Sequence, residues 1–212
     1  MWLNPLAWRS AAADPGRWLV LDVESSGLDA SSDRLLALAA VSLRHDGDRA
    51  WIDLADSFEA VLRQPADLRP PDKSNILVHG IGVGAQGRGV DPAEALRAFE
   101  AFVGASPLLG YHVDFDRRMI DRAMQAVLAR KLRGPWLDIA DVAAVLRPDS
   151  GARALDDWLQ LCGIECAQRH QAAADALATA ELMLHLWPAA RAEGVRHFGG
   201  LSRLAARRRW LS

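Results

Sequence analysis

The sequence feature that most constrains this chain is a pair of carboxylates inside an apolar segment near its N-terminus. Residues 17–28 read Arg-Trp-Leu-Val-Leu-Asp-Val-Glu-Ser-Ser-Gly-Leu, a strand-like run that contains Asp22 and Glu24. Side chains two apart in a strand point to the same face, so both carboxylates leave one side of the sheet close together. Two like charges held this close cost free energy unless a cation lies between them. The pair therefore predicts either a cation site or a solvated strand end, followed by the turn that Ser-Ser-Gly favours.

Composition limits the classes of protein to consider. The chain has 212 residues, half of them hydrophobic, which is enough for one domain with a substantial core. A net charge of -2 provides no global basic field, so any binding of nucleic acid must depend on local positive charge. No segment approaches the roughly 18 apolar residues of a membrane span, and the N-terminus lacks the positive region of a signal peptide. We therefore expect a cytoplasmic protein with no membrane partner, in which Cys162 and Cys166 are unpaired thiols.

The first part of the chain predicts antiparallel strands. Apolar, strand-like segments at 18–24 and 35–44 are followed by two more at 50–54 and 57–62. His45-Asp46-Gly47-Asp48 is a tight-turn signal between the second and third of these segments. The simplest arrangement is a three-stranded meander that starts from the strand with the carboxylate pair.

Later in the chain, strand and helix patterns alternate. Asp91 and Pro92 have the N-cap and first-turn signals of a helix, whereas the glycine-rich residues 82–89 predict a flexible connection. Alternation after a meander favours an α/β fold, with a mixed sheet and helices on its faces. The remaining predicted elements are short strands at 107–111 and 136–139 and helices at 114–132, 142–146, 155–161 and 172–186, the last closed by Pro188.

Two further acidic sites follow the first pair. Asp114 and Asp116 lie within Tyr-His-Val-Asp-Phe-Asp, at a junction of strand and helix where an aspartate can also merely cap the helix. Asp175 lies in a run of Ala and Leu, where a charged residue is either on the solvated face or paired. His170, five residues before Asp175, would by itself more often be a surface or core histidine.

These motifs, taken together and in order, carry a specific resemblance. Asp-x-Glu, then Phe-Asp at a strand–helix junction, then His-x4-Asp resembles the DnaQ-like (DEDDh) family of 3′-to-5′ exonucleases, and Val-His-Gly-Ile at 78–81 looks like the family's His-Gly-Ile segment. The resemblance implies a ribonuclease-H-like fold, a mixed β-sheet flanked by helices. We accordingly divide the chain into an irregular lead-in at 1–16, an exonuclease domain at 17–190 and a basic C-terminal tail at 191–212.

The resemblance also implies a metal site with a general base. Two divalent ions, Mg²⁺ or Mn²⁺, would be held by four carboxylates, and His170 would deprotonate the attacking water. Hard cations prefer oxygen ligands, and a histidine that is neutral near pH 7 can accept a proton. The four implied ligands are Asp22, Glu24, Asp116 and Asp175.

Residues implied to contact substrate surround this site. Leu28 and His79 fall where the family packs against the terminal nucleotide. Ser25 stands where the family usually has Thr, and it keeps the hydroxyl group. Tyr111-His112 replaces the family's common His-Asn, so the finer substrate contacts of this chain are expected to differ.

The implied activity is hydrolysis of phosphodiester bonds from the 3′ end of DNA or RNA. Two metals about 3.5–4 Å apart stabilise the charge that builds on the attacking and leaving oxygens. The expected partner is a single-stranded or frayed 3′ end, together with a polymerase or another repair protein. Two alternatives stay open: a catalytically silent module of this fold that binds nucleic acid or a partner, and a small-molecule hydrolase of an unrelated mixed fold. The tail at 203–210, rich in Arg, is either a contact to nucleic-acid backbone or a solvated end.

Overall fold

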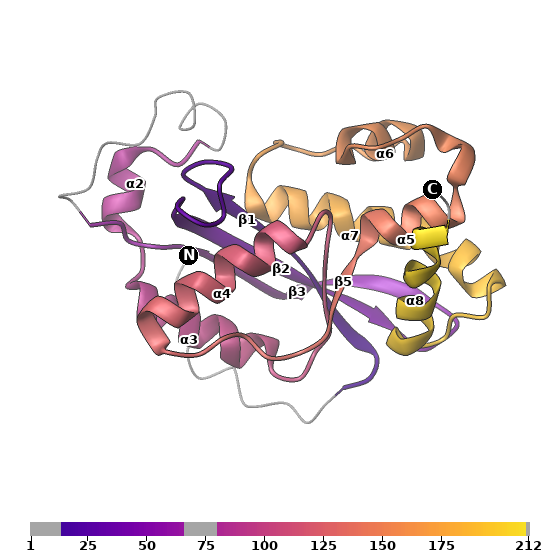
Figure 1. Ribbon diagram of the computed structural model, residues 1–212, viewed down its shortest axis with the longest axis horizontal. Coiled ribbons are helices and arrows are strands. Elements are labelled where there is room, and N and C mark those ends of the chain that lie inside the picture. Colours follow the sequence, from indigo (N-terminus) through magenta and orange to yellow (C-terminus); the bar gives the residue numbers. More distant parts are fainter. Residues whose placement is uncertain (1–13, 66–79, 211–212) are drawn as a thin grey trace.

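The computed structural model describes residues 14–65 and 80–210, which form a five-stranded mixed sheet covered by helices (Figure 1). The strand order is β3-β2-β1-β4-β5. The strands are β1 (Arg17–Ser25), β2 (Leu35–His45), β3 (Ala50–Val61), β4 (Leu108–Gly110) and β5 (Trp136–Asp138). The first three pair antiparallel, and β4 and β5 continue the sheet in parallel with β1. The predicted α/β class and the predicted meander are therefore confirmed.

The third strand differs from its prediction in one respect. The segments predicted at 50–54 and 57–62 form a single strand, β3, along β2. The pairing shifts where Val41 faces Ser57 and Ser42 faces Asp53, so that residues 54–56 form a bulge. An irregularity of this kind leaves extra residues unpaired without ending the strand, which explains why the apolar pattern was interrupted there.

Helices surround the sheet. The helix predicted from Pro92 begins there, with the Asp91 carboxylate accepting hydrogen bonds from the amides of Ala93 and Glu94. The helices are α2 (Val83–Arg88), α3 (Pro92–Val103), α4 (Asp114–Leu128), α5 (Ile139–Leu146), α6 (Leu155–Cys162), α7 (Ala172–Ala192) and α8 (Phe198–Ala205), with 3-10 turns η1 (Pro148–Ser150) and η2 (Ala206–Trp210). None of the helices in the described parts of the chain has the length and apolar character needed to cross a membrane.

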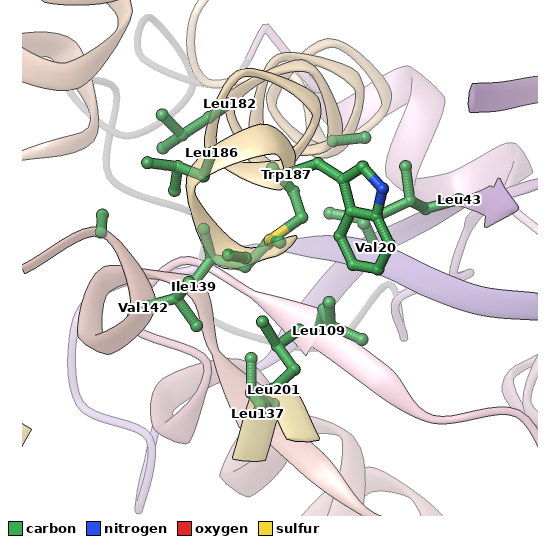
Figure 2. Close-up of a cluster of buried hydrophobic side chains, with 14 of the residues drawn as sticks. Val20, Leu43, Leu109, Leu137, Ile139, Val142, Leu182, Leu186, Trp187 and Leu201 are labelled. Atoms are coloured by element: carbon green, nitrogen blue, oxygen red, sulfur yellow. The ribbon is translucent and has the colours of Figure 1, made fainter. Parts of the chain in front are cut away.

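Alternation along β1 creates two cores. Leu19 and Leu21 pack in one core with residues of α3 and α4, whereas Trp18 and Val20 pack in a second core with residues of α5 to α8. In the second core, Trp187 of α7 extends over the strand residues (Figure 2). Asp22 and Glu24 continue the series of Trp18 and Val20, so their carboxylates emerge on the α7 face. The alternation thus decides which helix the acidic pair meets.

Three predicted features are wrong. The glycine-rich connection contains α2, in which buried Gln86 accepts a hydrogen bond at its carbonyl from the amide of Gln64 at 2.9 Å, a tertiary contact that offsets the poor helix propensity of glycine. Helix α7 passes through Pro188 to Ala192, because burial of residues such as Ala190 continues beyond the proline. The helix predicted to reach residue 132 ends at Leu128, where Ala129 adopts a left-handed φ of 53°.

The C-terminal segment is ordered into the same core. Gly199 and Gly200 lie inside α8, whose N-cap His197 accepts a hydrogen bond from the amide of Gly200 at 3.3 Å. Leu201 and Leu204 of α8 are buried in the core that contains α7. The division predicted at residue 190 stays a prediction, and the structure adds that residues beyond it contribute to this core.

Candidate active site

Three carboxylates converge where β1 meets α7. Ligand oxygens of Asp22, Glu24 and Asp175 all lie within 4.8 Å of one another, in the part of the chain that the structure describes. The first two come from alternate positions of β1, and the third comes from the first turn of α7. Helix α7 makes extensive contact with β1 and β2, so the packing of one helix on the sheet brings distant parts of the sequence together.

Asp116 is held beside this trio by the backbone of β1. It lies in the first turn of α4, is 5% exposed, and accepts a hydrogen bond through Oδ1 from the amide of Val23 at 3.1 Å. Among the charged neighbours of Asp22, Asp116 has the largest effect on its pKa. Asp114, by contrast, is exposed and lies 3.9 Å from Arg118, as expected for a solvated residue of the same helix turn.

Burial and mutual repulsion raise the pKa values of Asp22, Glu24 and Asp116. Burial, followed by the charges of Asp116, Glu24 and Asp175, raises the pKa of Asp22 well above its usual range. Burial, with the charge of Asp175 added, raises the pKa of Glu24 to about 7. The pKa of Asp116 rises to about 8, again chiefly through burial. Such shifts are typical of sites that hold a cation or carry out proton transfer.

Arg169 supplies positive charge to the cluster. Its Nη1 donates to Oδ1 of Asp175, and its Nε donates to Oδ1 of Asp156 on α6. The guanidinium also lowers the pKa of Asp22 and of Glu24, partly opposing the effects of burial. A single guanidinium thus ties the start of α7 to α6 and offsets some of the repulsion among the carboxylates.

The donor set fits a hard divalent cation. Oε1 of Glu24 is buried and has no hydrogen-bond partner among the described residues. A buried, unpaired carboxylate oxygen is costly unless a positive group contacts it. Because the cluster offers several oxygen ligands on one face of β1, it matches the preference of Mg²⁺ or Mn²⁺.

His170 stands at the entrance to α7. Its backbone amide donates to Oδ2 of Asp175 at 3.0 Å, and its φ of 60° is left-handed. A non-glycine residue in that region is held there by its surroundings, and such residues concentrate at functional sites. The His170 residue is exposed, so an external group can approach its imidazole.

The residues expected to contact substrate are placed as follows. Leu28 is 94% exposed and lines a groove with Phe115 of α4. Ser25 Oγ donates to the carbonyl of Gly27 at 2.5 Å, which shapes the turn after β1. His79 lies outside the described residues. The structure therefore places two of the three residues on the edge where β1 ends.

Two functional candidates were missed from the sequence. Asp138 caps α5, accepting from Ala140 N at 2.9 Å and from His112 N at 3.0 Å, and its charge raises the pKa of Asp116. Its signal was available, because Trp-Leu-Asp precedes an apolar helix and Asp is a preferred N-cap. The role of Arg169 depends on contacts between separate elements, and no local pattern could have indicated it.

A mixed five-stranded sheet of this order, flanked by helices, is the arrangement of a ribonuclease-H-like fold, and here acidic side chains gather beside its central strand. The sequence matches a family model described as Exonuclease over residues 19–183. The chain therefore belongs to the exonuclease family.

Relatives and structural neighbours are similar over most of this chain. The DNA polymerase III PolC-type protein of Bacillus subtilis is 26% identical over 93% of the chain, and a DNA polymerase III subunit epsilon-like protein of Rhodobacter capsulatus is 29% identical over 87%. The alignments cover 13% and 25% of those two relatives. An E. coli exonuclease I in complex with single-stranded DNA has the same fold, with a TM-score of 0.67 at 20% identity, over 85% of this chain and 43% of that one.

The raised pKa values predict how stability depends on pH without metal. An acid whose pKa is raised by folding has no effect on stability below its unfolded pKa. Between the unfolded and the folded pKa it destabilises the fold increasingly as pH rises, and above the folded pKa the loss of stability is constant. With folded values of about 7 for Glu24 and about 8 for Asp116, we expect the melting temperature in chelator to fall between pH 5 and pH 8. The melting temperature of Asp116→Asn should fall less over this range and lie about 5 °C above that of the wild type at pH 8.

Differential scanning calorimetry of both proteins across this pH range measures the difference. The Asn side chain can still accept the hydrogen bond from Val23, so the substitution removes charge and little else. A variant that melts well below the wild type at pH 8 would contradict the prediction and assign Asp116 a structural role in α4.

Proposed function

We propose that this protein is a metal-dependent 3′-to-5′ exonuclease that hydrolyses phosphodiester bonds at the end of a strand. The observation that carries the proposal is the convergence of Asp22, Glu24 and Asp175 within 4.8 Å, with an unpaired Glu24 oxygen among them. Asp116 completes the implied ligand set from the neighbouring helix. Two divalent ions bound there, Mg²⁺ or Mn²⁺, would supply Lewis-acid stabilisation of the attacking and leaving oxygens.

The protein's own residues then position the reactants. His170, exposed at the entrance to α7, accepts the proton of the attacking water as general base. The family resemblance supports this role, and the hydrogen bond from its backbone amide to Asp175 holds the main chain of His170 next to one of the carboxylates. Leu28 projects from the end of β1, where its exposed side chain packs against the terminal nucleotide. Ser25 keeps the turn between them in shape.

A single-stranded or frayed 3′ end is the proposed substrate. DNA is favoured because the similar proteins are named as DNA polymerase III proteins and an exonuclease I bound to single-stranded DNA. For the same reason a polymerase is the proposed protein partner. The chain spans between an eighth and a quarter of the length of those curated relatives, so only the shared domain supports this partner. We place this activity in the cytoplasm.

Attack from a strand end predicts a specific product pattern. A linear single strand labelled at its 5′ end should shorten one nucleotide at a time and release mononucleotides, because the family resemblance implies that exposed Leu28 packs against the terminal nucleotide. A circular strand of the same sequence should stay intact under the same conditions. Products separated on a denaturing gel, with DNA and RNA in parallel, report both direction and sugar preference. Cleavage of the circle at a rate similar to that of the linear strand would rule out an exonuclease of this type.

A further inference from the structure

A second polar pocket adjoins the carboxylate cluster. It has a volume of about 570 Å³ and lies between the ends of β4 and β5, the start of α5, the loop before α6 and the C-terminal η2. Asp138 lines the pocket and accepts a hydrogen bond from the amide of His112 at 3.0 Å, two residues before α4, the helix that carries Asp116. A ligand that lies across the carboxylates can therefore extend into this pocket.

Arginine side chains give the pocket a cationic wall. Arg147, Arg153 and Arg208 line it, and none of the three makes an ion pair with a carboxylate among the described residues. The two arginines that flank Arg208 in η2 do have partners. Arg207 pairs with Glu193 at 2.6 Å, and the Arg209 guanidinium lies over the Trp210 ring. The guanidinium groups on this wall are available to an incoming anion.

The carboxyl groups in the pocket weaken this positive charge without cancelling it. Burial raises the pKa of Asp138 and of Asp141. The charge of Arg208, which lines the same pocket, lowers the pKa of Asp141. Three guanidinium groups thus face two carboxyl groups, both of which burial disposes toward the neutral form.

Aromatic residues that depart from the family pattern form another wall. Tyr111 and His112 stand where the family commonly has His-Asn, and their rings lie 4.6 Å apart. The Tyr111 hydroxyl donates to the carbonyl of Arg153 at 2.5 Å, which fixes the loop that presents this arginine. His112 adopts a left-handed φ of 55°, and Asp138 holds its amide. This chain's substitutions therefore help to build the pocket.

We propose that this pocket binds a phosphodiester group of the nucleic-acid strand, other than the one that is cleaved, and that Arg208 is a principal contact. Guanidinium groups bind phosphate oxygens in a bidentate manner, and aromatic rings beside a basic wall suit a single strand. The volume lies within the range of about 300–1,000 Å³ that is usual for ligand sites. The inference rests on the proposed function, since the neighbouring site supplies the reason for a nucleic-acid strand.

Two substrates of different length test the proposal. The p-nitrophenyl ester of thymidine 5′-monophosphate reaches only the carboxylate site, whereas an oligonucleotide also reaches the pocket. Arg208→Ala should raise KM for a single-stranded oligonucleotide about 10-fold, the loss expected for one charge-assisted contact, and leave the KM for the ester unchanged. The salt dependence of oligonucleotide binding should fall by about 1 in log–log slope. Arg208→Lys should restore part of the affinity.

Arg209→Ala is the matched control, because Arg209 is equally exposed in the same turn but lies outside the pocket. Fluorescence anisotropy with a labelled oligonucleotide measures binding independently of turnover. The proposal would be overturned if Arg208→Ala and Arg209→Ala had the same KM and the same anisotropy with the oligonucleotide. It would also be overturned if Arg208→Ala raised the KM for the ester as much as the KM for the oligonucleotide. If the wild type cleaves neither substrate, the proposed function fails, and the anisotropy comparison still decides whether the pocket binds the strand.

Discussion

Asp116→Asn is expected to abolish hydrolysis, whereas Asp114→Asn, two residues earlier on the same helix, should leave it close to the wild-type rate. Asp116 is buried against β1 next to the carboxylate trio, and Asp114 is exposed and paired only loosely with Arg118. Loss of a single stabilising donor at a transition state already costs about 10²–10³ in kcat. Removal of one charged ligand should cost at least as much. Initial rates on a labelled oligonucleotide with saturating Mg²⁺ or Mn²⁺ measure the effect.

Metal binding separates the possible causes of this loss. Added Mg²⁺ or Mn²⁺ should raise the melting temperature of the wild type, because a ligand that binds the folded state stabilises it by mass action. The increase should be smaller for Asp116→Asn and unchanged for Asp114→Asn. If Asp114→Asn were the inactive variant, the motif would have to be shifted by one helical half-turn, and the proposed ligand set would be wrong.

His170→Ala is expected to slow turnover by about 10²–10⁴-fold while metal binding survives. The imidazole is proposed to act on the attacking water and not as a metal ligand. Its contact to the cluster runs through the backbone amide, which donates to Asp175 at 3.0 Å and is kept in the alanine variant. Single-turnover rates report the chemical step, and isothermal titration with Mn²⁺ reports the affinity for metal.

His185→Ala provides the matched control, because His185 is an exposed histidine of α7 away from the carboxylates. It should retain the wild-type rate and metal affinity. An unchanged single-turnover rate in His170→Ala would remove His170 from the mechanism. A loss of metal affinity in that variant would instead make His170 a ligand. Because its φ is left-handed, a glycine variant checks that backbone strain in the alanine variant is not the cause.

Arg169 explains how this cluster is accommodated in the fold. It joins Asp175 to Asp156 of α6 and lowers the pKa values of Asp22 and Glu24. Functional sites commonly retain unfavourable local interactions that the rest of the structure compensates. Here the compensation comes from an arginine next to His170, so the loop before α7 contributes both to the stability of the site and to its proposed chemistry.

The sequence by itself determined the features that depend on near neighbours. The strand-like run at 18–24 places Asp22 and Glu24 on one face, because side chains two apart in a strand point the same way whatever packs on them. The Asp91 cap and the helix that follows were equally local, since the carboxylate bonds amides two and three residues away. The order of the acidic motifs then indicated the family and with it the fold. The roles assigned to those acidic residues and to His170 stay predictions.

Only the tertiary structure decided the features that depend on contacts between distant segments. Helix α2 forms in a glycine-rich stretch because Gln86 is buried, and α7 continues through Pro188 because the residues beyond it face the core. Asp175 approaches Glu24 because α7 packs on β1. The pocket lined by Arg208 forms because η2 packs against α5. Packing of this kind depends on the shape and burial of many side chains at once, so no local pattern in the sequence specifies it.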